Sequence, residues 1–396
     1  MTRSLIPCCL AISLTSGCVV NECSQPAYWL PECRVQAENE FARLVSADGV
    51  ELRFQSPTTT RFGSWEARGV LVERGDGVVE ARVSTLGDFL ITVHPGPHLV
   101  DDLTVEIHNV HPLTETLDNE IGRDGLQRTV SVEVVDEVVE IRGSMPPEVC
   151  SSGFELAAVG DIQTNPVQFQ RIIQDLHIEA AAAAEAGTPL LGLLLLGDLS
   201  ETSEPEELDV VLDMLRSAPV PTAAVPGNHD VYAANDAVFT RRFGAGNMAF
   251  DVCDAHVVML DTGSGRLANS IVGRFPEFLD TDQKFTVAGM HHPPLPGRSS
   301  SGWTAEDQAQ HLVAELAARD ADMVLAGHAH RRFEFTDTPV HEVVVGTGGA
   351  TQYAAQPDYG YLQMVFGDRL KTCFIEVSAP GPEAEVSPSH APRTCR

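Results

Sequence analysis

Residues 190–198 read LLGLLLLGD, an apolar run that ends in a glycine and an aspartate. A run of this length, rich in leucine and closed by glycine, is typical of a strand that is buried on both faces of a sheet. Gly197 allows the backbone to turn sharply after the strand. The stretch therefore predicts a buried strand that delivers the Asp198 carboxylate to the edge of a sheet.

Four further polar motifs follow apolar runs in the same way. The runs are residues 156–159, 222–225, 285–290 and 323–326, and the motifs are Gly160-Asp161-Ile162-Gln163, Gly227-Asn228-His229-Asp230, His291-His292-Pro293-Pro294 and Gly327-His328-Ala329-His330. Helical patterns lie between several runs, over residues 167–186, 206–215 and 307–318. Strands that alternate with helices predict a largely parallel sheet, whose ligand crevice lies outside the carboxyl ends of the strands. We therefore expect all five motifs on one rim.

The residue types in these motifs indicate a metal site. Carboxylate, amide and imidazole groups are suitable ligands for divalent ions, and scattered motifs of this kind converge only where a fold brings strand ends together. The chain has neither a Gly-x-Ser-x-Gly elbow nor a Walker phosphate loop, which argues against a serine hydrolase and a nucleotide-binding P-loop enzyme.

The order and spacing of the five motifs are those of a known superfamily. Residues 154–377 resemble the calcineurin-like metallophosphoesterases, which include purple acid phosphatases and phosphodiesterases. The intervals are 37 residues from Asp161 to Asp198, 30 to Asn228, 63 to His291 and 37 to His328. The resemblance implies an α/β fold in which a β-sandwich is flanked by helices, in the layer order αββα.

The resemblance also implies two metal ions, whether manganese, iron, zinc or magnesium, with Asp198 bridging both. Gln163 stands where most relatives have histidine, and its amide oxygen is a weaker donor than imidazole, so we expect the first ion to bind loosely or to be manganese or magnesium. Of the adjacent pair, His291 rather than His292 matches the motif. The implied ligands are Asp161, Gln163 and His330 for the first ion, and Asn228, His291 and His328 for the second.

The implied reaction is hydrolysis of a phosphate mono- or diester by a hydroxide that bridges the two ions. Metal coordination lowers the pKa of bound water from about 15.7 towards 7, so no protein base is required. His229 would stabilise or protonate the leaving oxygen, and Asp230 would orient the His229 ring. Alternatives are a catalytically silent, surface-binding descendant and an exported nuclease or nucleotide pyrophosphatase.

Side chains near the motifs are candidates for substrate binding. Arginines would attract the phosphate, and aromatic rings would form a wall for an organic leaving group, although exposed charges and packed rings explain them equally well. The candidates are Arg298, Arg331 and Arg332 for the phosphate, and Trp303, Tyr353 and Tyr359 for the wall.

The first residues predict export. Arg3 precedes a short apolar stretch, residues 5–14, and Ser16-Gly17-Cys18 follows it. This pattern is typical of a secretory signal, and a cysteine after glycine resembles the cleavage motif of bacterial lipoproteins, in which Cys18 is lipidated. We expect a signal peptide over residues 1–17 and a lipid-anchored protein at the cell envelope, with an ordinary cleaved signal as the alternative.

Cysteine usage and turn residues predict the remaining organisation. Six cysteines follow Cys18, an even number that suits disulfides in an oxidising compartment, and Cys23 with Cys33 is the most local pair. Residues 18–39 are predicted as a linker, 150–377 as the catalytic domain and 378–396 as a flexible tail. Residues 40–149 carry short alternating segments, over residues 50–54, 69–72, 78–83, 89–93, 103–107 and 130–141, that predict an antiparallel β-sandwich. This accessory domain would position the catalytic face, bind a surface polymer or act as a spacer.

The net charge limits the partners. The chain has 56 acidic and 26 basic residues, which gives a formal charge of -30. Because such a chain repels polyanions, duplex nucleic acid is not expected as a substrate, and the membrane would be contacted through the N-terminal lipid alone. A small phosphate ester is the expected substrate.

Overall fold

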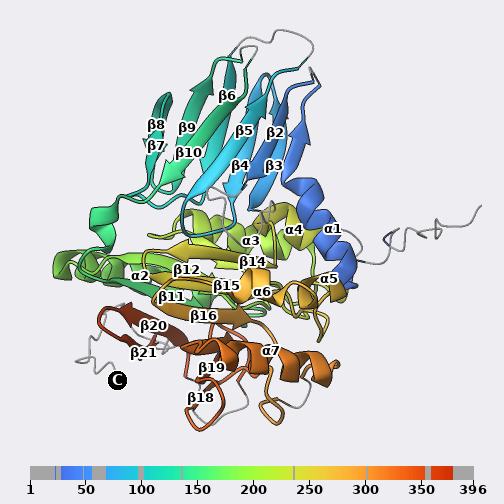
Figure 1. The fold of residues 1–396 in the computed structure, drawn as a ribbon, viewed down its shortest axis with the longest axis vertical. Helices are drawn as coiled ribbons and strands as arrows, with labels where there is room; N and C mark the ends of the chain where they lie inside the picture. Colours follow the sequence, from blue (N-terminus) through green and yellow to red (C-terminus); the bar gives the residue numbers. More distant parts are fainter. Residues whose placement is uncertain are drawn as a thin grey trace, which may run out of the picture.

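The computed structural model describes residue 23 and residues 28–47, 49–55, 68–96, 102–134, 137–234, 237–299, 302–352 and 358–377. Figure 1 places two N-terminal sheets at one end of the molecule and two helix-covered sheets at the other. The predicted signal peptide, Cys18 and the tail over residues 378–396 lie outside the described residues. Among the described residues, no helix is long and apolar enough to cross a bilayer.

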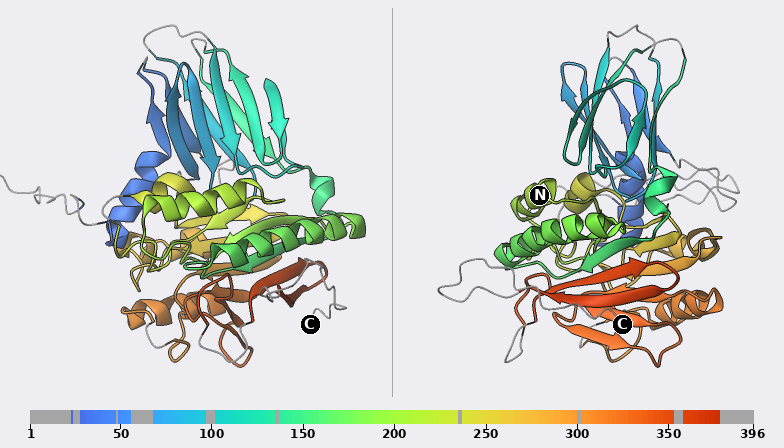
Figure 2. Two further views of the ribbon diagram at one scale, coloured as in Figure 1. Left: turned by 180° about the vertical axis from the view of Figure 1, so that it is seen from behind. Right: turned by 90° about the vertical axis from the view of Figure 1, so that its left-hand side faces the viewer.

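The N-terminal region is a sandwich of two five-stranded sheets (Figure 2, right). Its inner faces share one apolar core, to which Leu52 and Ile91 contribute from one sheet and Val79 and Ile107 from the other. One sheet has the order β1 (Arg43–Val45), β2 (Glu51–Gln55), β5 (Phe89–His94), β10 (Val139–Ser144), β7 (Glu115–Leu117), and the other β3 (Gly69–Gly75), β4 (Val78–Val83), β6 (Leu103–His108), β9 (Gln127–Val132), β8 (Glu120–Asp124).

Two details of this sandwich differ from the sequence prediction. Strands β4 and β6 pair in parallel, whereas the prediction was antiparallel throughout. Residues 130–141 were predicted as one alternating segment, but β9 and β10 lie in opposite sheets. Alternation of apolar residues continues across a sheet-to-sheet connection because each strand buries the same kind of face, so periodicity alone does not locate the break.

The C-terminal region contains the predicted strands in two stacked sheets. The predicted runs at residues 285–290 and 323–326 match β16 and β17 residue for residue. One sheet has the order β13 (Thr222–Ala224), β12 (Leu190–Leu195), β11 (Phe154–Val159), β20 (Gly360–Phe366), β21 (Leu370–Glu376), and the other β14 (Met248–Val252), β15 (Ala255–Leu260), β16 (Phe285–Met290), β17 (Met323–Ala326), β19 (Glu342–Val345), β18 (Arg332–Phe335).

Helices cover the outer face of each of these sheets, which confirms the predicted αββα layers. In β12, Leu194 faces the core between the sheets, while its neighbours Leu193 and Leu195 pack against the outer helices. This is why the strand is apolar without interruption: both of its faces are buried. The helices are α2 (Pro166–Ala186), α3 (Pro205–Arg216) and α4 (Val238–Phe243) on one side, and α5 (Asn269–Val272), α6 (Phe275–Leu279) and α7 (Glu306–Ala318) on the other.

The parallel strands bring the motifs together. Strands β11, β12 and β13 run parallel in one sheet, and β15, β16, β17 and β19 run parallel in the other. Asp161 and Asp198 follow the first two of these strands, and His291 and His328 follow β16 and β17. Carboxyl ends of parallel strands lie at the same edge, so the predicted rim exists.

A helix begins within the segment that the sequence predicts as a linker and covers its last nine residues, 31–39. Helix α1 (Pro31–Phe41) carries two charged residues, Arg34 and Glu38, on its buried face. Arg34 is 1% exposed and makes a two-point ion pair with Asp261 through Nε and Nη2, at 2.5 and 2.9 Å. A helix is predicted from the spacing of its apolar residues, and charged residues on the buried face of α1 interrupt that spacing. For this reason the sequence did not predict the helix.

The buried Glu38 carboxylate predicts a measurable pH dependence of stability. Burial, with the nearby Asp261 charge, raises the pKa of Glu38 from 4.5 to about 8. The unfolded chain therefore loses this proton near pH 4.5 while the folded chain keeps it, so this group destabilises the fold by about 1.4 kcal/mol per pH unit as pH rises through that window. In urea titrations, Glu38→Gln is expected to gain stability relative to wild type from pH 5 to 8 and to gain nothing further above pH 8.

The exposed Glu40 on the same helix gives the control. Glu40→Gln should track the wild type at every pH. A Glu38→Gln variant whose stability difference from wild type is the same at pH 5 and pH 8 would contradict the buried-acid assignment.

The two regions are joined by polar contacts and by a disulfide. The Asn109 side chain accepts from the Thr222 N–H and donates to the Thr222 carbonyl, both at 2.8 Å, and so pairs with the free edge of β13. The short helix η1 (Pro147–Cys150) leads from one region to the other, and Cys150 is bonded to Cys253. The predicted Cys23–Cys33 disulfide is also present.

Candidate metal centre

Two groups of metal-binding side chains lie at the rim. In the first, ligand atoms of Asp161, Asp198 and His330 all lie within 4.8 Å of one another. The fully buried Asp161 accepts the His328 N–H through Oδ2 at 2.7 Å. Its Oδ1 has no hydrogen-bond partner among the described residues and lies 3.4 Å from His330 Nε2. A buried carboxylate oxygen without a donor is costly unless a cation satisfies it, so this group fits a metal ion.

The second group contains three histidines. Ligand atoms of His291, His292 and His328 lie within 4.8 Å of one another. His291 Nδ1 lies 2.8 Å from the Leu196 carbonyl and donates to it, which leaves the Nε2 lone pair facing the centre. That Nε2 lies 3.1 Å from Asn228 Oδ1 and 3.2 Å from His328 Nδ1. The predicted ligands of the second ion therefore converge.

Asp198 lies between the two groups. Its Oδ2 is 3.3 Å from His291 Nε2, while the residue also belongs to the first group with Asp161. Its Oδ1 accepts the His229 N–H at 2.9 Å. One carboxylate thus touches both halves of the centre, as a bridging ligand requires.

Gln163 is turned towards the same carboxylate. Its Nε2 donates to Asp198 Oδ2 at 2.7 Å, and the residue is 8% exposed. The Gln163 amide nitrogen is therefore engaged in a hydrogen bond to Asp198, and the Gln163 amide oxygen is the atom that can bind a metal ion.

The backbone at the ligands is strained. Five of the seven predicted ligand residues have positive φ: Asp161 (61°), Gln163 (37°), Asp198 (53°), His328 (70°) and His330 (47°). Non-glycine residues rarely adopt this conformation, and such strain clusters at functional sites. The fold holds these side chains against a backbone preference, as is common at functional sites.

His229 lies beside the two groups without belonging to either. Its Nδ1 donates to the Glu201 carbonyl at 2.7 Å, and its side chain is 25% exposed. The donation fixes the ring and leaves Nε2 as the ring nitrogen that the Glu201 carbonyl does not engage.

The sequence of this part of the chain matches a known family. Residues 154–332 match the profile of the calcineurin-like phosphoesterases. These residues form a calcineurin-like phosphoesterase domain. The predicted resemblance is confirmed.

Relatives of the phosphoesterase domain include bacterial proteins. A 3',5'-cyclic-nucleotide phosphodiesterase of Nostoc sp. (strain PCC 7120) is 30% identical over 170 residues, which is 39% of this chain and 61% of the relative. A probable cyclic nucleotide phosphodiesterase of Synechococcus sp. is 26% identical over 148 residues, which is 36% of this chain and 58% of the relative. The chain spans less than two thirds of the length of these relatives. A dimetal phosphatase from Danio rerio is similar in structure, with a TM-score of 0.45 and 14% identity over 57% of this chain and 96% of that one.

The electrostatics of the phosphoesterase domain favour cation binding. Burial raises the pKa of Asp161 to about 8. Burial would lower the pKa of His291, but the Asp198 and Asp161 carboxylates outweigh it and raise that pKa to about 9. Without metal the centre therefore holds protons at neutral pH, and a divalent ion would displace them, because ligands bind in the deprotonated form.

The predicted role of Asp230 is wrong. Its carboxylate accepts the N–H groups of Leu199, Ser200 and Gly227 and the Ser200 hydroxyl, and it is fully buried. Through these hydrogen bonds, the Asp230 carboxylate connects the loop after β12 to the loop after β13. The Glu201 carbonyl, a backbone atom that no sequence pattern reveals, orients His229 instead.

The predicted substrate-binding residues are only partly accounted for. Arg298 is paired with the buried Glu342 at 2.9 Å and stacks on Phe335, so the prediction that it binds substrate is not supported by its contacts. Arg331 is exposed, and its role stays a prediction. Trp303 is buried and donates to the His292 carbonyl at 2.8 Å, which makes it a support of the histidine loop rather than an open wall. Tyr353 lies outside the described residues.

The cavity at the second group is lined by the predicted ligands Asn228 and His328 and by aromatic side chains that the sequence analysis did not predict. This cavity has a volume of about 350 Å³. Its aromatic members are Trp29, from the segment before α1, and Tyr232. The lining residues are Trp29, Asn228, Val231, Tyr232, Gly263, Ser264, Gly265, His292, Gly302, Thr304 and His328.

Glycine at position 227 is required by close packing against Asp198. A Cβ at this position would lie 2.1 Å from Asp198 Oδ1 and 2.3 Å from the Asp198 nitrogen. We expect Gly227→Ala to displace the carboxylate and lower bound manganese and ester hydrolysis at least about tenfold, because a ligand misplaced by about 1 Å costs up to 10²-fold in rate. Metal analysis and a chromogenic ester assay measure both.

Gly367 supplies the matched control, since a Cβ there meets nothing within 4 Å. Gly367→Ala should behave as wild type. If Gly227→Ala binds manganese and hydrolyses the ester as the wild type does, the position of the Asp198 carboxylate is not critical for metal binding or catalysis.

Proposed function

We propose that this chain hydrolyses phosphate esters with two divalent metal ions bound at the rim of the phosphoesterase domain. The convergence of two donor groups on one shared carboxylate, Asp198, carries this proposal. Phosphodiesters are the preferred class, because two relatives are named as cyclic-nucleotide phosphodiesterases.

The side chains divide the work between binding and proton transfer. Asp161, Gln163 and His330 would hold one ion, and Asn228, His291 and His328 the other, with Asp198 common to both. The ions, when bound, supply a water of lowered pKa and neutralise charge on the phosphate oxygens. His229, oriented by the Glu201 carbonyl, donates a proton from Nε2 to the leaving oxygen.

Metal analysis with two parallel assays tests this function. The protein loaded with Mn²⁺ is assayed on p-nitrophenyl phosphate and on its bis ester. Turnover of the bis ester at a higher kcat/KM than the monoester is the expected result. Bound metal with no turnover of either ester would favour the binding-only alternative, and preference for the monoester would indicate a phosphatase.

We also propose that the protein is exported and anchored by a lipid on Cys18. The N-terminal pattern supports this, because Arg3 is followed by an apolar stretch and then by Gly17-Cys18. Two disulfides, Cys23–Cys33 and Cys150–Cys253, also support it, because disulfides suit an oxidising compartment. Expression in a bacterium with radiolabelled palmitate tests it: the wild type should be labelled and Cys18→Ser should not. A labelled Cys18→Ser or an unlabelled wild type would contradict the anchor.

A further inference from the structure

The N-terminal segment reaches the edge of the metal centre. Trp29 lines the same cavity as Asn228, His292 and His328, although it lies 125 residues before the start of the phosphoesterase match at residue 154. An element outside the catalytic domain thus forms part of the wall next to the proposed ligands. Nothing in the proposed reaction uses it.

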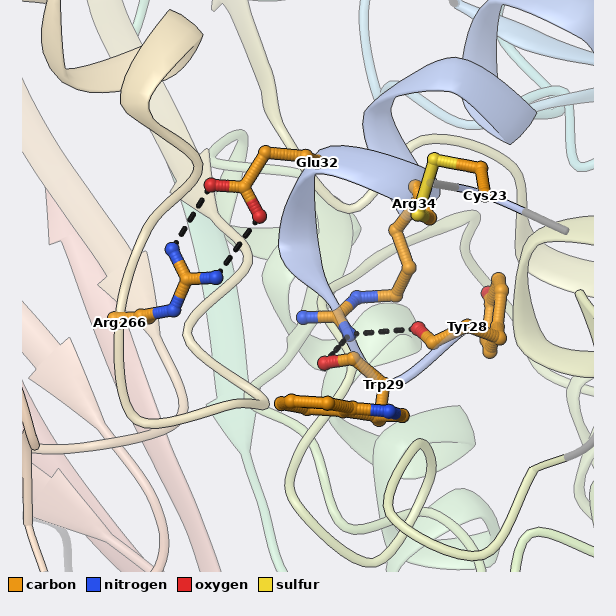
Figure 3. The surroundings of a disulfide bond; sticks show 7 residues. Cys23, Tyr28, Trp29, Glu32, Arg34 and Arg266 are labelled. Carbon is orange, nitrogen blue, oxygen red and sulfur yellow. Dashed lines mark hydrogen bonds and ion pairs between the residues drawn. A yellow bond between two sulfur atoms is a disulfide. The ribbon is translucent and has the colours of Figure 1, made fainter. Parts of the chain in front are cut away.

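The backbone that carries Trp29 is held by a buried arginine. Arg34 Nη1 donates to the Tyr28 carbonyl at 3.1 Å and to the Trp29 carbonyl at 3.0 Å (Figure 3). The Ser264 hydroxyl donates to the same Trp29 oxygen. Arg34 is in turn held by Asp261, which follows β15. A hydrogen-bonded network therefore fixes Trp29 relative to the catalytic domain.

Two further connections hold the same segment. Glu32 makes two hydrogen bonds with Arg266, both at 2.9 Å, and Cys23 is bonded to Cys33 (Figure 3). Arg266 belongs to the loop after β15 that also supplies Gly263, Ser264 and Gly265 to the cavity. The segment is braced against the very loop that forms the cavity wall.

The indole itself is left open to solvent. Trp29 is 52% exposed and Tyr232 is 56% exposed. Burial of a large aromatic ring is favourable, and both rings border the cavity. The Trp29 carbonyl is held by Arg34 and Ser264, and the Tyr232 N–H donates to the Asn228 carbonyl at 3.0 Å. A rigid backbone with an exposed ring is the arrangement expected of a surface that buries its ring when a ligand binds.

Tyr232 connects this aromatic wall to the proposed acid. Its ring packs edge-to-face on His229 with the centroids 5.2 Å apart, and its hydroxyl donates to the Glu201 carbonyl that also orients His229. A group leaving towards His229 would therefore pass beside Tyr232, in the cavity that Trp29 also lines.

We propose that Trp29 and Tyr232 form the binding site for a planar aromatic group on the ester, such as the base of a nucleotide. This assignment rests on the proposed function and deepens it by naming the substrate class. Stacking of a base on an aromatic side chain depends on its flat face and tolerates any base, so the site would select nucleotides over esters without a ring rather than one base over another.

Binding measurements test the assignment without relying on turnover. AMP and ribose 5-phosphate share the sugar phosphate and differ in the base, and their affinities for the Mn²⁺-loaded full chain are measured by calorimetry. We expect AMP to bind about tenfold or more tightly than ribose 5-phosphate. Trp29→Ala should reduce the AMP affinity by about that factor and leave that of ribose 5-phosphate unchanged, while Trp29→Phe and wild type should behave alike.

Several outcomes would overturn the assignment. They are equal wild-type affinities for the two compounds, no measurable binding of AMP, or a loss in Trp29→Ala that is the same for both. Tyr232→Leu gives a second, independent variant with the same expected selectivity loss. If the wild type fails these binding tests but hydrolyses esters, the aromatic site is refuted and the proposed function is supported. If AMP binding depends on the base but no ester is hydrolysed, the aromatic site is supported and the proposed function is refuted.

Discussion

Replacing Asp198 by asparagine is expected to lower kcat/KM for ester hydrolysis by about 10³-fold or more and to reduce the bound manganese. The residue is 1% exposed and belongs to the first donor group, while its Oδ2 lies 3.3 Å from His291 in the second. Asparagine keeps the size but loses the negative charge that two cations require, and the loss of one preorganised electrostatic group alone costs about 10²–10³ in rate. Metal analysis and steady-state kinetics measure the two effects.

Asp213→Asn is the matched control for this variant. Asp213 is 69% exposed and pairs with Arg216 on the outer surface of α3, so its replacement should leave metal content and rate unchanged. An Asp198→Asn protein with wild-type manganese and wild-type rate would remove the bridging role.

His229→Ala is expected to lower kcat by about 10²–10⁴-fold while the metal content stays at the wild-type value. A positioned general acid contributes a factor of this size. The His229 ring belongs to neither donor group and is held by the Glu201 carbonyl, so its loss removes a proton donor without removing a ligand. The loss should be greater for an alkyl leaving group than for p-nitrophenolate, because a good leaving group needs less protonation.

His177→Ala provides the comparison. His177 also donates its ring N–H to a backbone carbonyl, that of Ser217 at 2.7 Å, but it is exposed on α2. It should keep full activity. Parallel loss of metal and activity in His229→Ala would mean that the histidine is a ligand and not the acid.

The ligand rim was predictable because its signals are local. Each motif follows an apolar run that is buried on both faces, and parallel strands necessarily align their carboxyl ends. Asp161, Asp198, His291 and His328 could therefore be named from the sequence together with the strands that carry them. The apolar pattern did not predict that these strands are divided between two sheets. A strand that is buried on both faces has the same apolar sequence whether it belongs to one large sheet or to one of two stacked sheets.

The parts that escaped prediction depend on contacts distant in sequence. Helix α1 was missed because two of its five buried residues, Arg34 and Glu38, are charged and are expected at the surface from sequence. Asp230 follows His229 directly, yet its carboxylate binds N–H groups of another loop. Trp29 is held at the cavity by contacts such as the ion pair between Arg34 and Asp261, which are 227 residues apart. Backbone donors and acceptors carry no sequence signature.

Anomalous diffraction from crystals soaked in Mn²⁺ tests whether two ions share Asp198. We expect two peaks about 3.5–4 Å apart, one beside Asp161 and His330 and the other beside His291 and His328, with the Asp198 carboxylate between them. No peak at the rim, or a single peak without contact to Asp198, would contradict it.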